Sequence, residues 1–287
     1  MHVSVLAGTA LEYLAIRPDG TYVDATFGAG GHSRAILDRL KTGRLIAIDA
    51  DPSAHARGLT HPLLTLVHEN FRNLNAILDE LEITQIDGVL FDLGVSSMQF
   101  DQMQRGFSFR ESAPLDMRMN SQQGRSAFDI LSTASETELA DIFFYYGQER
   151  AARKIARVIV SRRSAGKLPT TTTEFAGLVS GLMHRRGERE KLHPATRVFQ
   201  ALRIAVNDEI DSLRDGLHSA VSRLRGAGRV VAISFHSLED RVVKTTFRED
   251  GRLEVLTRKP IVPGSDEIAR NPRSRSAKLR AAEKKAS

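Results

Sequence analysis

Residues 22–33 read Tyr-Val-Asp-Ala-Thr-Phe-Gly-Ala-Gly-Gly-His-Ser, a short apolar run that opens into a glycine-rich turn. The run predicts a buried β-strand over 22–27, and the apolar spacing of 32–40 predicts a helix directly after the turn. Glycines at a strand-to-helix turn allow the backbone to approach a ligand closely. The segment therefore predicts an α/β fold whose first turn can bind a ligand.

The same alternation of strand and helix continues along the chain. Apolar runs typical of strands occur at 44–48, 63–67, 86–93 and 229–235. Helical patterns lie at 53–59, 71–81 and 238–247, and a terminal pair of strands is expected near 253–256 and 277–282. Strands and helices at this spacing predict a doubly wound, parallel, Rossmann-like sheet.

A helical region interrupts this pattern. Four helical segments are expected between the fourth and fifth strands, at 127–131, 136–145, 149–163 and 173–183, and a long helical region runs from 196 to 224. An insert of roughly 90 residues has the size of a small domain. We therefore expect a Rossmann-like domain made of 1–100 and 196–287, with an inserted helical domain at 101–195.

Composition excludes several classes of protein. The 287 residues include no Cys, which excludes disulfide scaffolds, Cys-ligated zinc, iron–sulfur clusters and thiolate nucleophiles. A net charge of +6 favours a polyanionic partner but fits an ordinary basic surface equally well. No apolar run approaches the roughly 18 residues of a membrane span, and the N-terminus lacks a basic signal region. We expect a soluble, cytoplasmic protein.

Two interpretations of the glycine turn compete. A dinucleotide-binding turn needs G-x-G-x-x-G, and here Ser33 stands at the third glycine. The other is the acid-x-G-x-G-x-G turn of S-adenosylmethionine (SAM) enzymes, with Thr26 at the first glycine. Asp24 favours SAM, because a carboxylate can meet its ammonium group and would repel a pyrophosphate. A tight turn without a ligand is the simplest alternative.

Polar or aromatic residues follow the next three strands. Asp49 lies 21 residues after Gly28, where an acid receives ribose hydroxyls, and Asp92 ends the fourth strand. Phe71 follows the third strand and could lie beside an adenine or pack in the core. Because strand ends face the ligand crevice of a doubly wound sheet, these residues are expected near the turn.

The missing cysteine also limits the chemistry open to a SAM enzyme. Methylation at carbon five of a pyrimidine generally requires a thiolate, which leaves an amine, a ring nitrogen or a hydroxyl as the acceptor. An exocyclic amine needs little base strength, and mainly requires hydrogen-bond acceptors that aim its lone pair.

Six segments together resemble one family. They are 24–33 (DATFGAGGHS), 92–97 (DLGVSS), 105–109 (RGFSF), 114–119 (PLDMRM), 193–204 (HPATRVFQALRI) and 234–244 (SFHSLEDRVVK). They are similar to the bacterial ribosomal RNA small subunit methyltransferase H family, also called the MraW family, and the resemblance runs from His2 to Glu283. It implies a SAM-dependent Rossmann-like methyltransferase with an inserted, RNA-binding helical domain. The implied reaction methylates the exocyclic amine (N4) of one cytidine in the decoding region of 16S rRNA, in the small ribosomal subunit.

The resemblance also implies site residues. The implied cofactor contacts are Gly30, Gly31, His32, Asp49, Phe71, Asp92 and Gln99. Met98 stands where the family has proline, which leaves the aim of Gln99 less secure than that of the other contacts. No metal-ligand spacing stands out among the nine His residues.

Two residues are candidates for the chemistry. Asp92 would accept hydrogen bonds at the transfer site, or would position the cofactor. His236 follows the fifth strand and would orient the cytosine or take its proton, or would be a structural histidine at a helix start.

Four further residues are candidates for contacts with RNA phosphate or a neighbouring base: Asp116, Arg118, His193 and Arg197. An ion pair of Asp116 with an arginine of the same domain is the alternative. Two other functions stay open at this point. One is a catalytically silent RNA-binding assembly factor. The other is a nicotinamide-dependent oxidoreductase, and Ser33 and Asp24 both count against this second function.

Overall fold

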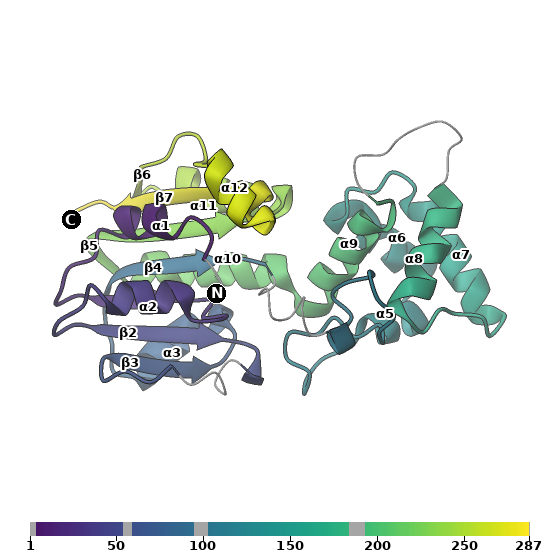
Figure 1. The fold of residues 1–287 in the computed structure, drawn as a ribbon, viewed down its shortest axis with the longest axis horizontal. Coiled ribbons are helices and arrows are strands. Elements are labelled where there is room, and N and C mark those ends of the chain that lie inside the picture. Colours follow the sequence, from purple (N-terminus) through teal and green to yellow (C-terminus); the bar gives the residue numbers. More distant parts are fainter. Residues whose placement is uncertain (1–3, 54–58, 95–102, 184–192, 287) are drawn as a thin grey trace. The chain divides into compact units, whose positions relative to one another are not determined.

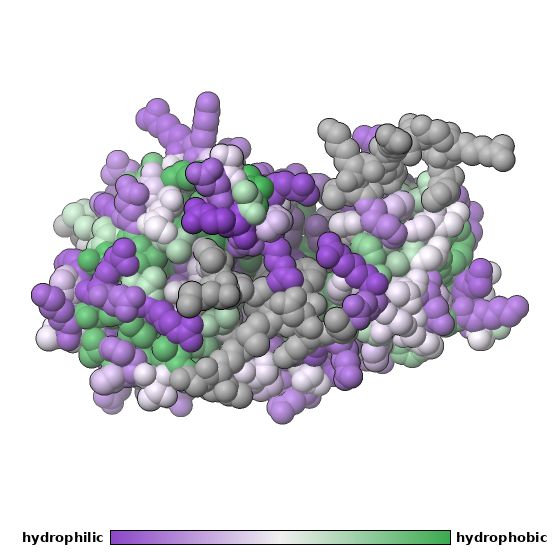
Figure 2. Space-filling view, in the orientation of Figure 1, coloured by the Kyte–Doolittle hydropathy of each residue, from purple (hydrophilic) through white to green (hydrophobic). Residues whose placement is uncertain are grey.

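The computed structural model describes residues 4–53, 59–94, 103–183 and 193–286. The chain divides into two compact units, the first comprising Met1–Gly94 and Ile210–Ser287 and the second Val95–Glu209. Both are drawn in Figure 1, and each is described separately below. On the face drawn in Figure 2, hydrophilic residues are spread over both units with apolar areas between them.

The first unit is built on a seven-stranded sheet of the order β3-β2-β1-β4-β5-β7-β6 within the described residues. Five strands are parallel: β1 (Thr21–Asp24), β2 (Arg44–Asp49), β3 (Leu64–His68), β4 (Ile86–Asp92) and β5 (Leu224–Ser234). At one edge, β7 (Lys278–Lys284) runs antiparallel to β5, and β6 (Leu253–Val255) runs antiparallel to β7. The expected parallel arrangement therefore holds for the first five strands, and the terminal pair departs from it.

Helices cover both faces of this sheet (Figure 1). On one face lie α1 (Ala7–Leu14) and α2 (Gly31–Leu37), and on the other lie α3 (Leu74–Glu80), α10 (Glu209–Arg223) and α11 (Ser237–Glu249). The short α12 (Ser265–Arg270) contacts the start of α1, where Glu267 Oε1 accepts from the Leu6 N–H at 2.7 Å. Strands such as β4 are apolar on both sides because both faces are covered.

The strand order reverses between β1 and β4. From β1 the chain builds outward through β2 and β3, then returns to β4 on the other side of β1. Ligands of open α/β sheets bind at the carboxyl ends of the strands at such a reversal. Asp24 and Asp92 end the two strands that flank it.

The second unit is helical. It contains α5 (Ala127–Thr133), α6 (Glu136–Asp141), the π-helical segment η4 (Ile142–Tyr146), α7 (Ala152–Ser164), α8 (Thr172–Met183) and α9 (Ala195–Asn207) around one apolar core. Helices α5 and α6 begin at Ser126 and Ser135, whose side chains close capping boxes with Asp129 and Glu138. The helix expected at 136–145 therefore ends as an α-helix at Asp141 and continues in π form.

The boundary after the insert differs from the expected one at residue 196. Helix α9 belongs to the helical unit, because Val198, Phe199 and Leu202 are buried in the core of that unit. The long helical region expected from 196 to 224 is two helices, separated at Asp208, whose φ is +49°. The helical pattern at 53–59 lies largely outside the described residues. No helix in the described part of the chain is long and apolar enough to cross a membrane.

Candidate functional site

The glycine turn after β1 is fixed to the end of β2. Gly28 and Gly30 have φ of +53° and +75°, a left-handed conformation that favours glycine. The Gly28 N–H donates to Asp49 Oδ2 at 2.7 Å, and a Cβ added to Gly30 would lie 2.9 Å from the Phe27 ring. The turn thus requires glycine at residue 30, and Asp49 holds it in place.

Asp24 is completely buried and accepts hydrogen bonds from two residues of the glycine turn and the helix that follows it. Its Oδ2 accepts from Ser33 Oγ at 2.7 Å, and its Oδ1 accepts from the Thr26 N–H at 3.2 Å. Burial raises the pKa of Asp24. The expected contact of Asp24 with an ammonium group is therefore not supported, because both oxygens are engaged and none of the residue is exposed. Ser33, which breaks the dinucleotide pattern, is its hydrogen-bonding partner.

His32 and Asp92 meet at the carboxyl ends of β1 and β4. His32 Nε2 lies 3.3 Å from Asp92 Oδ2, and the Asp92 N–H donates to Thr26 Oγ1 at 2.7 Å. Burial opposes charge on His32, but the acidic side chains of Asp92, Asp24 and Glu267 outweigh it and raise the pKa of His32. The start of α2 and the end of β4 are therefore joined electrostatically.

Three buried polar atoms in this cluster have no hydrogen-bond partner within the described residues. They are Asp92 Oδ1 and both ring nitrogens of His32, of which Nε2 has only the ion-pair contact with Asp92 Oδ2. A buried polar group without a hydrogen-bond partner lowers the stability of a protein by about 1–3 kcal/mol. Such a group at the carboxyl ends of the strands is consistent with a ligand that supplies the missing hydrogen bond. A donor group of a bound ligand therefore fits Asp92 Oδ1, and the glycine turn beside it allows the backbone to approach a cofactor such as SAM closely.

The structure brings five of the seven expected cofactor residues to this edge: Gly30, Gly31, His32, Asp49 and Asp92. Asp49 uses its second oxygen to accept from the Asp51 N–H at 2.8 Å. Phe71 also follows a strand end, but its ring packs edge-on against Phe91 at 5.5 Å, as the core interpretation predicted. Gln99 lies outside the described residues.

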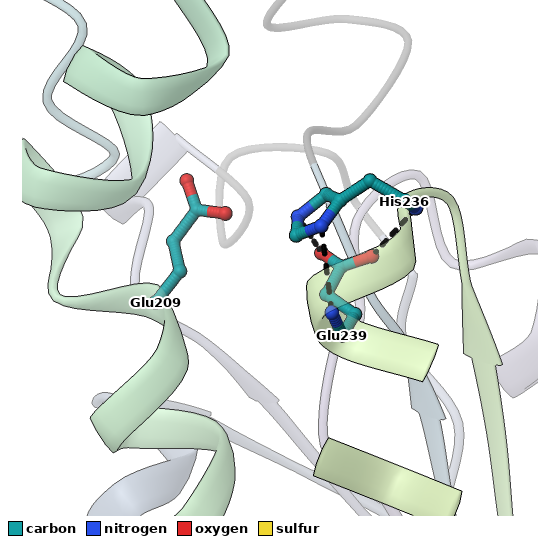
Figure 3. Close-up of side chains that lie close together, drawn as sticks. All are labelled: Glu209, His236 and Glu239. Atoms are coloured by element: carbon teal, nitrogen blue, oxygen red, sulfur yellow. Dashed lines mark hydrogen bonds and ion pairs between the residues drawn. The ribbon is translucent and has the colours of Figure 1, made fainter. Parts of the chain in front are cut away.

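His236 is a structural histidine at the start of a helix, as one of its two interpretations expected. It is the N-cap of α11: Nδ1 accepts from the Glu239 N–H at 3.4 Å, and Nε2 lies 3.0 Å from Glu239 Oε1 (Figure 3). Glu239 Oε2 in turn accepts from the Phe235 N–H at 2.8 Å. Glu209, also drawn in Figure 3, belongs to the second unit by its contacts and binds Arg203 through both oxygens at 2.7 Å.

Three of the four expected RNA-contacting residues have partners inside the helical unit. Arg118 forms a two-pronged ion pair with Asp116, at 2.9 and 2.8 Å, which was the alternative considered for Asp116. Burial raises the pKa of Asp116, but the hydrogen bonds and positive charge of Arg118 outweigh this effect and hold that pKa below its usual range. His193 Nδ1 accepts from the Ala195 N–H at 3.2 Å at the start of α9. Arg197 is exposed, and its side chain has no hydrogen bond or ion pair to another described residue.

Sequence reasoning missed two residues of this site. Thr26 binds the backbone of Asp92, and its place at the first glycine of the SAM pattern was the available signal. Glu239 orders the turn after β5, and its position three residues after His236 is the spacing of a capping box.

The chain is similar to known proteins over almost its full length. The sequence model of the MraW methylase family matches residues 1–285. The ribosomal RNA small subunit methyltransferase H of Cyanothece sp. is 50% identical over 286 residues, which cover 99% of this chain and 95% of that protein. The protein of the same name from Thermomicrobium roseum is 48% identical, over 99% of this chain and 93% of that protein. A solved structure of a putative rRNA methylase from Clostridium thermocellum aligns over 99% of this chain and 100% of that one, with 11% identity and a TM-score of 0.47.

Proposed function

This chain belongs to the MraW methylase family, and from that premise we propose that it methylates the exocyclic amine (N4) of a cytidine in the decoding region of 16S rRNA. The family resemblance and the α/β fold expected from the sequence are confirmed. The chain is a SAM-dependent methyltransferase that acts on ribosomal RNA. The nucleotide, the position on its ring and the small ribosomal subunit as partner are the proposed part.

The observation that carries the proposal is the unpaired Oδ1 of Asp92, next to the glycine turn. Bound at this edge, SAM supplies a methyl group activated by a positively charged sulfur. Asp92 Oδ1 accepts a hydrogen bond from the cytosine amine, which turns the nitrogen lone pair out of conjugation. His32 keeps the other oxygen of Asp92 engaged, so that Oδ1 is the one presented.

An amine acceptor also agrees with the residues available. The chain has no Cys, so a route through a covalent adduct at the pyrimidine ring has no thiolate. An amine needs no strong base, because its proton becomes acidic once the methyl group has been transferred. In this proposal, Asp92 Oδ1 receives that proton.

The helical unit is the proposed RNA-binding part. Residues 95–209 hold 17 Lys and Arg against 13 Asp and Glu, so they carry +4 of the net charge of +6. An excess of positive charge in the insert favours contact with phosphate. Arg197, exposed and without a described side-chain partner, is the best candidate among the four expected residues.

The test is transfer of tritiated methyl from SAM to small ribosomal subunits, followed by digestion of the 16S rRNA and mass spectrometry of the nucleosides. The expected product is N4-methylcytidine in a decoding-region fragment. Label in another nucleoside would contradict the proposed target. SAM binding without transfer to any subunit preparation would instead support a catalytically silent assembly factor.

A further inference from the structure

Two neighbouring aromatic rings lie on the surface of the helical unit. Phe144 is 54% exposed and Tyr145 is 63% exposed, and their ring centroids are 5.2 Å apart at an angle of 80°. Val262 is the other large apolar side chain of comparable exposure in the described part of the chain. Adjacent exposed aromatic residues are unfavourable in water and commonly mark a binding surface.

The exposure of this pair follows from the packing of its neighbours. Phe143 is completely buried in the core of the unit, and a Cβ on Gly147 would lie 2.7 Å from both the Phe143 and the Arg197 carbonyl oxygens. Segment η4 is thus held tightly against α9 on both sides of the pair. Of the three rings between these two residues, Tyr146 packs partly against the core, and Phe144 and Tyr145 stay exposed. Segments of π-helix often occur at functional sites.

Exposed charged residues flank the pair in the sequence and on the helix that contacts η4. The α9 turn that contacts η4 carries the exposed Arg197, and Gln200 of that turn donates from Nε2 to the Tyr146 carbonyl at 3.3 Å. Arg150 follows η4 and is exposed, and Asp141 precedes it as an exposed acid. Aromatic faces with arginines beside them match unpaired RNA, whose bases stack on rings while its phosphates bind guanidinium groups.

We propose that Phe144 and Tyr145 form a stacking platform for unpaired bases of the RNA substrate. This inference rests on the proposed rRNA methyltransferase function and adds to it a defined contact for nucleotides outside the reacting one. The expected ligand is single-stranded RNA, because its unpaired bases can stack on the rings and its phosphates can bind the arginines nearby.

The experiment measures binding of the full chain to a fluorescein-labelled, short single-stranded RNA and to the same RNA with abasic riboses. Two double variants are compared. F144L/Y145L keeps apolar side chains but removes the rings, and F144Y/Y145F keeps both rings. We expect F144L/Y145L to weaken binding of the intact RNA about tenfold and F144Y/Y145F to change it less than about twofold.

Two further results are expected if the rings stack on bases. The abasic RNA should bind the unmodified chain about as weakly as the intact RNA binds F144L/Y145L, and the two effects should not add. The salt dependence of binding should be the same for all three proteins, since no charge is removed. SAM affinity by calorimetry reports whether each variant is folded.

Several outcomes would overturn the inference. If F144L/Y145L binds RNA normally while the unmodified chain methylates ribosomal subunits, the platform is wrong and the proposed function stands. If the variant changes only the sedimentation of the protein, the pair is a contact between copies. If the unmodified chain binds neither RNA nor subunits, the proposed function itself fails. Should F144L/Y145L lose SAM affinity, the comparison of intact with abasic RNA on the unmodified chain decides.

Discussion

His32 Nε2 lies 3.3 Å from Asp92 Oδ2, so a buried imidazole on the first turn of α2 faces the carboxylate that ends β4. The contact joins the segment after β1 to the neighbouring strand β4 across the reversal of strand order. It leaves one oxygen of Asp92 without a protein partner in the described residues. The pair therefore defines which atom of Asp92 can meet a ligand.

Asp92→Asn should separate the two roles considered for this residue. The change keeps the shape of the side chain and removes the charge that accepts from the cytosine amine. We expect turnover to fall about 100-fold or more, the usual effect of losing one polar group at a reacting centre. SAM affinity, measured by calorimetry, should change much less. An equal loss of SAM affinity would instead assign Asp92 to cofactor positioning, and near-normal turnover would exclude both roles.

His32→Gln should give a pH-dependent change in stability. Because the acidic side chains around it raise the pKa of His32 in the folded protein, charged His32 stabilises the fold. That stabilisation is complete below the unfolded pKa of about 6.5 and is lost as pH rises through the higher folded value. Urea unfolding of both proteins across this range should show a difference that shrinks with rising pH. The shrinkage should be smaller in the Asp92→Asn background, and a constant difference would contradict the pairing.

Gly30→Ala should lower the free energy of unfolding more than the same substitution at Gly124, which has a similar backbone angle. Gly30 and Gly124 have φ of +75° and +77°, but only Gly30 has atoms close to a new Cβ, with Phe27 at 2.9 Å. We expect Gly124→Ala to lower the free energy of unfolding by about 1 kcal/mol and Gly30→Ala by about 3 kcal/mol. Thermal or urea unfolding checks this, and equal losses would show that the turn has room for a side chain.

Much of the first unit could be predicted because its signals are local. An apolar run that stops at an acid marks the ends of β2 and β4 at Asp49 and Asp92, whereas β1, which was expected to continue to Phe27, ends at Asp24. What each carboxylate binds could not be predicted, since Ser33 reaches Asp24 and the Gly28 N–H reaches Asp49 only through the path of the turn. Sequence spacing places such residues at one edge without stating which atoms meet.

The second unit shows a different limit. The apolar face of α9, with Val198 and Leu202, suits the core of either unit, so periodicity alone could not assign the helix. The π-helical form of η4 depends on how Phe143 and Gly147 pack against α9, which no local pattern encodes. The exposed aromatic pair was therefore not visible in the sequence.

Arg197→Ala should weaken RNA binding without affecting stability. The guanidinium is exposed and has no described partner, so its loss removes one phosphate contact and should lower the salt slope of RNA binding by about 1. Arg118→Ala is the matched control, because Arg118 is held by Asp116 and its loss should lower stability while leaving the salt slope unchanged. An unchanged slope for Arg197→Ala would remove this residue from the RNA contact surface.

His236→Asn should leave the pH dependence of methylation unchanged. His236 Nδ1 accepts from the Glu239 N–H at the start of α11, and an Asn side chain supplies an equivalent acceptor at an N-cap. Glu239→Ala, by contrast, removes the carboxylate that accepts from the backbone N–H groups of Phe235 and His236. It should lower the free energy of unfolding by about 1–2 kcal/mol. A pH–rate profile that loses one limb in His236→Asn, with stability intact, would restore this histidine as the proton acceptor, because a cap residue alone cannot move a kinetic pKa.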